Sequence, residues 1–489
     1  MVEARTMTGN MQPGDEARPV IVWFRDDLRL SDNPALRAAA QSGRPIVCVF
    51  IHDEESEGLR PVGGAARWWL HGSLQKLDAT LGDRGGRLSI YAGAAATVVP
   101  RLVEGFHAGA VFWNRRYGAA ERKVDEAVKT ALKAQQIEAS SFNGHLLYEP
   151  WSIRTKAGGP FRVFSAFWRA AHDAGEPEPP APVPSKLRFF KEPDMGGPRP
   201  VALADLALEP SAPDWAGGMR SAWQPGEAGA QAQLERFADE HLANYADCRD
   251  YPGRSSTSRL SPYLRFGNIS PRQAWHVANA AAGAGGHGAS RNLEKFQFEL
   301  GWREFSYHLL YYNSDMAVRN LQPKFDAMPW RDDTNALKAW QQGRTGYPIV
   351  DAGMRELWDT GWMHNRVRMV VASFLVKHLL IDWRQGEMWF WDTLVDADSA
   401  NNPANWQWVA GSGADAAPYF RIFNPVLQGE KFDPQGNYVR RWVPELADIP
   451  PSVIHRPWEA GPDIAGYPVR IVEHGEARRR ALEAYGDLA

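Results

Sequence analysis

One predicted helix carries an acid, a large aromatic ring and a cation at positions that share a face. Glu299, Trp302 and Arg303 stand three and four positions apart, a spacing that brings side chains together on a helix surface. A solvated helix face would not need the tryptophan, so the set indicates a binding site. The structural alternative is a salt-bridged surface stripe beside a core tryptophan.

A cluster of hydroxyl groups directly precedes the start of another predicted helix. It spans residues 255–261 and includes Thr257, Ser258 and Ser261. Hydroxyl groups and free N–H groups at such a place can hold a phosphate. On this cluster alone, an ordinary Ser or Thr helix cap is the simpler explanation.

Amide, guanidinium and thioether groups are concentrated in residues 361–369, where Asn365 and Met369 share a helix face. This mixture is uncommon on a plain surface, and the alternative is a buried arginine paired with Asp396 or Asp398. The spaced Asp and Asn residues between 396 and 408 lack the glycine and the closing glutamate of a calcium loop. No metal site is therefore predicted.

The composition is that of a folded protein with at least two domains. At 489 residues the chain is too long for one ordinary core, and its 44% hydrophobic and 23% charged residues are globular averages. The formal net charge of −3 excludes an overall basic excess, so any nucleic-acid contact must come from a local basic groove. Two cysteines make neither a disulfide framework nor a metal motif, which fits a cytoplasmic protein. No stretch is apolar for long enough to span a membrane.

The elements that must position these residues change in type along the chain. Short β-rich runs at 20–24, 46–50, 88–91 and 110–113 alternate with helical stretches, which predicts a doubly wound parallel sheet. Beyond residue 225 amphipathic helical patterns dominate, which predicts an all-α domain. The expected order is a flexible tail at 1–18, an α/β domain at 19–145, a Pro- and Gly-rich connector at 146–225 and a helical domain at 226–489.

Taken together, these segments resemble the photolyase/cryptochrome family, and they occur in the family's order. The resemblance extends from about residue 19 to about residue 450 and rests on segments 23–29, 257–261, 299–305, 345–352, 363–369 and 419–425. It implies an antenna-type α/β domain and a helical domain that binds FAD and DNA. It also implies a light-driven repair enzyme that splits cyclobutane pyrimidine dimers. The alternative is a cryptochrome photoreceptor, of the DASH type or another.

By this resemblance, one set of residues would bind FAD. Residues 257–261 match the segment that holds the FAD phosphates, and Asp398 matches the acid at the pyrimidine end of the flavin ring. Asn402 matches the residue that faces flavin N5, where an amide cannot donate a proton, which favours repair over signalling. The full set is Tyr245, Thr257, Ser258, Arg259, Leu260, Ser261, Phe296, Arg303, Arg368, Asp396, Asp398 and Asn402.

A second set would contact a pyrimidine dimer flipped out of damaged DNA. Its members are Glu299, Trp302, Asn365, Arg366, Met369 and Trp408. The related (6-4) photolyases carry histidines in place of Asn365 and Met369, so repair of cyclobutane dimers is favoured. DASH cryptochromes usually have a Gln-Asn pair where this chain has Val367 and Arg368.

The family's tryptophan relay, which reduces oxidised flavin from the protein surface, matches Trp406, Trp383 and Trp340. The further tryptophans could offer an alternative route, but packing in the core is the expected role of each. They are Trp358, Trp362, Trp389 and Trp391.

Two departures from the common pattern concern the class of photolyase and its antenna. Gly118 replaces a glutamate that several folate-binding members carry, and residues 402–405 replace the common double glycine before Trp406. The pattern looks more like the bacterial class III photolyases than class I. Methenyltetrahydrofolate is the expected antenna, at a different place on the N-terminal domain and without predicted binding residues. The alternatives are a deazaflavin or no antenna. The resemblance further implies a monomer that acts on damaged DNA.

Overall fold

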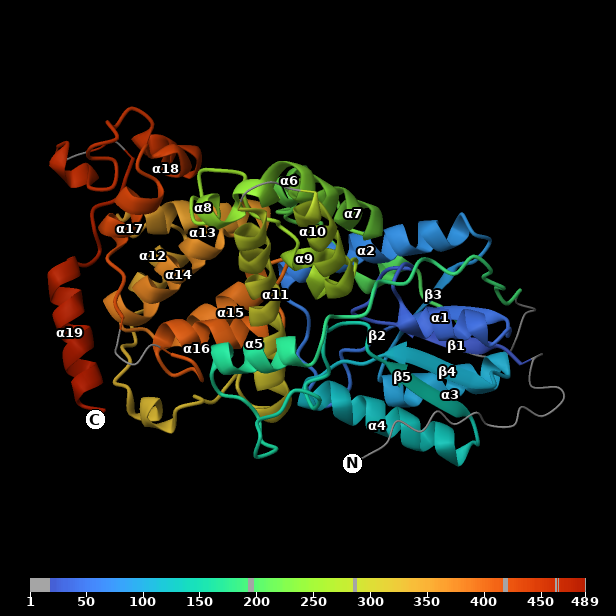
Figure 1. The fold of residues 1–489 in the computed structure, drawn as a ribbon. Coiled ribbons are helices and arrows are strands. Elements are labelled where there is room, and N and C mark those ends of the chain that lie inside the picture. Colours follow the sequence, from blue (N-terminus) through green and yellow to red (C-terminus); the bar gives the residue numbers. More distant parts are fainter. Residues whose placement is uncertain are drawn as a thin grey trace.

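The structure is a computed structural model that describes residues 18–191, 198–284, 288–416, 421–461, 464 and 466–488. The expected tail at 1–18 lies outside the described residues except for Arg18, and so do Tyr419 and Phe420 of the last family segment. The described chain forms two halves, a layered half built on a sheet and a larger helical half beside it (Figure 1).

Five parallel strands form one sheet in the order β3-β2-β1-β4-β5. They are β1 (Val20–Phe24), β2 (Ile46–His52), β3 (Leu88–Ala92), β4 (Ala110–Asn114) and β5 (Glu138–Phe142). The first four confirm the predicted β-rich runs. The fifth was missed because its residues are polar, and it is only half-buried at the edge of the sheet.

Helices cover both faces of the sheet, because alternate residues of a strand point to opposite sides. Val20 and Phe24 of β1 pack with one layer of helices, and Ile21 and Trp23 pack with the other. The first layer consists of α1 (Pro34–Gln41) and α2 (Gly64–Gly82), the second of α3 (Ala95–Phe106) and α4 (Ala119–Ala134). This arrangement confirms the doubly wound α/β fold.

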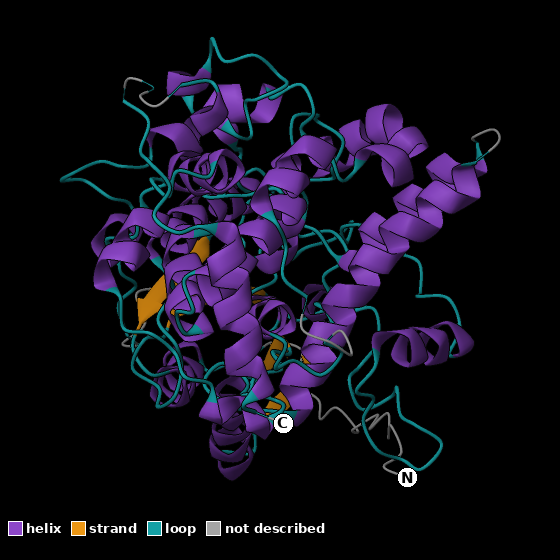
Figure 2. Cartoon of the chain, turned by 90° about the vertical axis from the view of Figure 1, so that its left-hand side faces the viewer, coloured by secondary structure: helices purple, strands orange, loops and turns teal. Residues whose placement is uncertain are grey.

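The rest of the chain is helical. Segment 146–225 contains α5 (Phe164–Asp173) and α6 (Gly217–Ala222) among loops and turns. From residue 226 the described part of the chain contains no strand, and Figure 2 shows helices filling most of this half. Its helices are α7 (Glu227–Arg236), α8 (Tyr245–Cys248), α9 (Ser261–Arg265), α10 (Pro271–Gly283), α11 (Ala289–Tyr312), α12 (Thr334–Gln341), α13 (Pro348–Thr360), α14 (Asn365–Ser373), α15 (Trp383–Thr393), α16 (Asn401–Ala410), α17 (Pro425–Phe432), α18 (Asn437–Trp442) and α19 (His474–Gly486).

Buried polar contacts fasten the loop after β1 to the helical half. Arg29 is fully buried and donates to the carbonyl oxygens of Gly267 at 3.0 Å and Gly144 at 2.7 Å. Gly267 has a φ of 60°, and a Cβ atom there would lie 2.1 Å from the carbonyl oxygen of Asp26. Only glycine allows this approach, so the loops after β1 and α9 are held in direct contact.

Asp26 forms an ion pair across the same junction, 2.8 Å from Arg265. Burial by itself would raise the pKa of Asp26, but the positive charges of Arg265 and Arg116 outweigh burial and lower this pKa to about 2. The carboxylate therefore stabilises the folded protein above the pKa that it has in the unfolded chain. This contribution is lost as the pH falls from about 4 to about 2.

Asp26→Asn should lower the free energy of unfolding by about 2 kcal/mol at neutral pH, because the charged form of Asp26 is the one stabilised in the fold. Urea unfolding followed by circular dichroism at about pH 7, 5 and 3.5 measures the loss. The difference in free energy of unfolding between the variant and the unchanged protein should be equal at the two higher pH values and smaller at the lowest. Asp83→Asn, at an exposed position, should change stability by less than about 0.5 kcal/mol. A difference in unfolding free energy that does not change with pH would contradict the role of the ion pair.

Candidate functional site

The hydroxyl cluster lies in the loop between α8 and α9 and keeps two hydroxyl groups available. Thr257 and Ser258 are half-buried, and within the described chain their hydroxyl groups have no hydrogen-bond partner. The Ser258 carbonyl oxygen accepts from Gln233 Nε2 at 2.7 Å, and Ser261 Oγ accepts from Trp362 Nε1 at 3.2 Å. The loop is thus fixed while two hydroxyl groups remain free to donate to an anion such as a phosphate.

Arg259 holds this loop in an uncommon backbone conformation. Its φ of 51° is in the left-handed region, which residues other than glycine rarely adopt. Its guanidinium lies over the rings of Trp223 at 4.3 Å and Trp362 at 4.9 Å. The next residue, Leu260, is buried. The two cation–π contacts hold the strained residue, which directly follows Thr257 and Ser258 in the sequence.

Arg368 on α14 and Asp396 form a two-pronged ion pair. Arg368 Nη1 donates to Asp396 Oδ1 at 3.0 Å and Nη2 donates to Oδ2 at 2.8 Å. The arginine that the sequence left to pair with Asp396 or Asp398 is thus the half-buried Arg368, and its partner is Asp396. Asp398 is used differently, because it accepts from the backbone N–H of Ala400 at 2.8 Å and caps the start of α16.

Asn402 is oriented by groups that the sequence did not single out. Its Nδ2 donates to the backbone oxygen of Glu387 at 3.0 Å and to Oε1 of the same residue at 2.8 Å. The Glu387 carboxylate in turn accepts two hydrogen bonds from Arg60 of the α/β half, at 2.7 and 2.9 Å. Because the amide nitrogen is occupied, only the oxygen of Asn402 is available to a ligand. No local signal identifies Arg60 or Glu387, which are 327 positions apart.

Arg303 is buried and directed toward the loop after β5. It donates to the backbone oxygen of His145 at 2.9 Å and contacts His145 Nε2 at 2.8 Å. Burial and the adjacent Arg303 charge lower the pKa of His145 well below its usual value, so the ring is neutral. Phe296 and Tyr245 lie in a separate aromatic cluster, with ring centroids 5.9 Å apart.

The three residues that share a helical spacing on α11 contact three different segments. Glu299 forms an ion pair with Arg249, just after α8. Trp302 stacks on Phe164 of α5, with ring centroids 3.8 Å apart and planes 10° apart. Arg303 reaches His145 instead. Because their partners belong to different segments, the spacing on α11 alone does not show that these side chains form one site.

A line of alternating charges leads from Glu299 to Arg366 on α14. Arg249 pairs with Glu299 and lies 3.8 Å from Asp250, which accepts a hydrogen bond from Arg366 at 2.8 Å. The sequence assigned no role to Arg249 or Asp250. Their partners lie 50 and 116 positions away, so only the fold shows the connection.

The remaining members of the second set lie on two helices that pack together, α14 and α16. Asn365 is exposed, and Met369 and Trp408 are half-buried. These side chains are accessible to a ligand, in contrast to the buried Asp396 and Asp398.

The three tryptophans of the expected relay are all buried. Trp340 and Trp406 have ring centroids 6.2 Å apart, and Phe390 lies 5.0 Å from Trp406. Trp383 donates from Nε1 to Asn320 at 2.9 Å. Trp340 and Trp383 are both 0% exposed, and the assignment of these three residues to an electron relay stays a prediction. Trp340 lies on the buried side of α12, and Trp383 lies on the buried side of α15.

Trp358 corrects the expectation for the further tryptophans. It was expected to pack in the core, but 57% of it is exposed. Its ring stacks on Trp389, with centroids 6.0 Å apart and planes 7° apart. It lies on the outer side of α13, where the helix pattern does not distinguish a stacked surface ring from a core ring.

The arrangement fits FAD in its chemistry. Two free hydroxyl groups and a cation could hold phosphates, carboxylates at 396 and 398 line the loop before α16, and the Asn402 oxygen is an open acceptor. Within the described residues no group of His, Cys, Asp and Glu side chains could hold a metal ion. None of the described helices is long and apolar enough to cross a membrane.

Comparison with known proteins agrees with this geometry. A family model described as DNA photolyase matches residues 20–185, and one described as the FAD binding domain of DNA photolyase matches residues 296–487. The chain is 52% identical over 476 residues to a deoxyribodipyrimidine photo-lyase of Agrobacterium fabrum, covering 96% of this chain and 97% of that protein. It is 38% identical to cryptochrome-1 of Arabidopsis thaliana, covering 99% of this chain and 72% of that protein.

A solved structure shares the whole architecture. The structure of a bacterial class III photolyase from Agrobacterium tumefaciens superposes with a TM-score of 0.92 at 48% identity, and 99% of each chain is covered. The fold of both halves agrees with the two matching family models. The sequence identity over nearly the whole length indicates the same family. The chain belongs to the DNA photolyase family.

Proposed function

We propose that this protein uses light to split cyclobutane pyrimidine dimers in damaged DNA, as a monomer and in the manner of the bacterial class III photolyases. The observation that carries the proposal is the dual use of α14. Arg368 on this helix joins the proposed cofactor residues through Asp396, whereas Arg366, two positions earlier, reaches outward to Asp250. A substrate on the outer side of α14 would therefore lie next to the cofactor.

The half-exposed residues supply contacts that a flipped dimer requires. A dimer pairs and stacks poorly, so it leaves the duplex at lower cost than intact bases, and this difference gives selectivity. Trp408 and the uncovered side of Trp302 would pack against the pyrimidines, and Asn365 would bond a base edge. Arg366 would bind a backbone phosphate. Glu299, which pairs with Arg249 in this structure, would turn from this partner to the dimer.

The cofactor residues would hold the flavin without taking part in bond cleavage. Reduced FAD, when bound, supplies on illumination the electron that opens the cyclobutane ring. Thr257 and Ser258 would bind its phosphates. Asn402 would present an amide oxygen to the ring, and its fixed orientation excludes proton donation from this residue.

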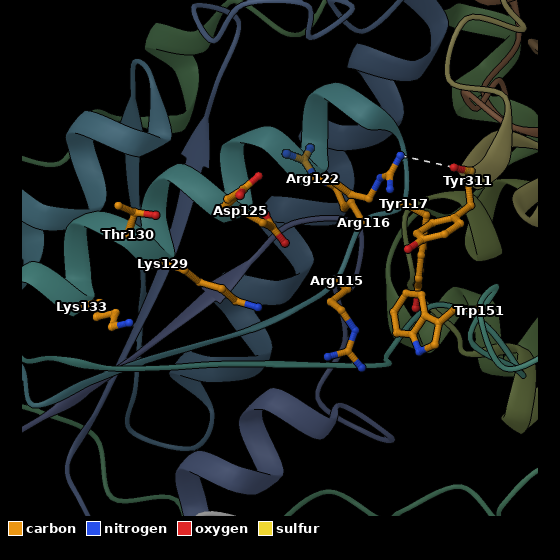
Figure 3. A pocket seen from close by; sticks show the side chains of 11 residues that line it. Arg115, Arg116, Tyr117, Arg122, Asp125, Lys129, Thr130, Lys133, Trp151 and Tyr311 are labelled. Atoms are coloured by element: carbon orange, nitrogen blue, oxygen red, sulfur yellow. Dashed lines mark hydrogen bonds between the residues drawn. The ribbon is translucent and has the colours of Figure 1, made fainter. Parts of the chain in front are cut away.

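We also propose a methenyltetrahydrofolate antenna and assign it a pocket. A cavity of about 400 Å³ lies between α4 and the end of α11, within the size range of small-molecule sites (Figure 3). Trp151 and Tyr311, with ring centroids 5.5 Å apart, form an aromatic wall. The wall is flanked by five cations, Arg115, Arg116, Arg122, Lys129 and Lys133. Rings and cations together suit a pterin with a carboxylate tail.

A second cavity, between the carboxyl ends of the strands and the loop at Asp398, has about 100 Å³ and is too small for this ligand. The larger pocket is therefore the assigned one. Figure 3 shows Lys129 and Lys133 along α4 on the side away from Trp151, where they can meet an anionic tail.

The first experiment is blue-light repair of a duplex with one thymine dimer by the purified protein with reduced FAD. Loss of the dimer in light and not in darkness is expected, with no repair of a matching (6-4) duplex, because Asn365 and Met369 are not acids. Repair of the (6-4) lesion alone would overturn the substrate. Absence of repair on both duplex and single-stranded DNA would favour a cryptochrome photoreceptor.

Lys129→Glu combined with Lys133→Glu should weaken binding of methenyltetrahydrofolate about tenfold, because the two ion pairs to the tail together contribute ~1–2 kcal/mol. The measurement is a titration of the folate-free protein, followed by folate absorbance and by energy transfer to FAD. Lys76→Glu, an exposed lysine on the opposite face of the sheet, is the charge control. Equal affinity in all variants would place the antenna elsewhere.

A further inference from the structure

The line of charges from Glu299 to Arg366 consists of four residues of alternating sign. Glu299 contacts Arg249, Arg249 lies 3.8 Å from Asp250, and Asp250 accepts from Arg366 at 2.8 Å. Asp250 is thus one carboxylate shared between two cations. Its side chain is 37% exposed, whereas those of Arg249 and Arg366 are 11% and 20% exposed. Water and ligands reach the acid more easily than the two cations.

Aromatic rings fix the two guanidinium groups from behind. Arg366 lies over the ring of Phe432 at 4.4 Å, and Arg249 lies over Tyr245 at 5.4 Å. Such stacking holds the plane of a guanidinium group, while the N–H groups at its edge can still donate to different acceptors. In this structure that acceptor is the Asp250 carboxylate for Arg366. A phosphate offers the same pair of oxygens and can take the place of this carboxylate.

We propose that Asp250 couples recognition of the lesion to binding of the DNA backbone. The inference rests on the proposed function, in which Glu299 meets the dimer and Arg366 meets a phosphate. When Glu299 turns to the dimer, Arg249 loses its closest carboxylate and pairs more tightly with Asp250. Asp250 then releases Arg366, which binds a phosphate. With undamaged DNA, Glu299 stays on Arg249 and Asp250 keeps Arg366 occupied.

Asp250 is on this account a positioning residue that raises the preference for damaged DNA. Its effect is carried by competition for Arg366 and not by contact with the lesion. Removing its charge should therefore strengthen binding of undamaged DNA and leave the complex with the dimer nearly unchanged.

The test compares the FAD-containing protein and Asp250→Asn, in the dark, on a duplex with one thymine dimer and on the same duplex without it. Binding of the undamaged duplex should strengthen about fivefold in the variant, the equivalent of one exposed ion pair. Its salt dependence should steepen by about 0.9 in logarithmic slope, because one more phosphate is neutralised. For the damaged duplex, the affinity of the variant should stay within about twofold of that of the unchanged protein, and the salt slope should stay the same.

Asp247→Asn is the matched control. Asp247 lies three positions earlier, pairs only with the exposed Arg291 among described residues and changes the net charge equally. It should leave the ratio of the two affinities unchanged. Asp250→Glu, which keeps the charge, should restore most of the preference. In an Arg366→Gln background, Asp250→Asn should have no further effect on either duplex.

The outcomes separate this proposal from the function on which it rests. If the unchanged protein does not prefer the damaged duplex, both the function and the coupling fail. If it does, and Asp250→Asn strengthens both duplexes equally or matches Asp247→Asn, the coupling alone is wrong. Retained FAD and an unchanged melting temperature in Asp250→Asn show that the effect does not come from misfolding.

Discussion

The ion pair between the half-buried Arg368 and the buried Asp396 fixes α14 against the loop before α16. Its carboxylate is only 3% exposed, and a charge so buried is stable only while its partner stays in place. Two positions away on the same helix, Arg366 reaches Asp250 on the outer side. One rigid helix therefore positions residues from both the proposed cofactor set and the proposed substrate set, and small displacements of α14 would affect both.

The α/β half contributes to this site although it carries neither set. Arg60, after β2, holds Glu387 by two hydrogen bonds, and Glu387 orients Asn402. The Arg29 hydrogen bond to Gly267 and the close backbone approach at Gly267 hold the two halves together. The sheet domain is thus part of the framework that determines which atom of Asn402 a ligand meets, in addition to any part it has in binding an antenna.

Local sequence patterns predicted the elements whose buried positions carry apolar residues. Four strands are apolar runs, whereas β5 is polar and at the edge, so its pairing with β4 depends on the fold. The same limit applies to the site. Residue types and resemblance singled out Asn402 and Glu299, but their partners Glu387 and Arg249 could not be found, because no local spacing connects them. Burial was also unpredictable for tryptophans: Trp340 is enclosed and Trp358 is exposed.

Asp396→Asn tests most directly whether the Arg368 ion pair organises the site. The measurement is the FAD content of the purified chain, together with the fraction of thymine dimers opened per absorbed light dose. Both should fall together, since the variant removes the carboxylate charge that holds the half-buried Arg368 guanidinium in place. Asp392→Asn, at an exposed position of the preceding helix, should preserve both. Full FAD content with full repair in Asp396→Asn would contradict the account.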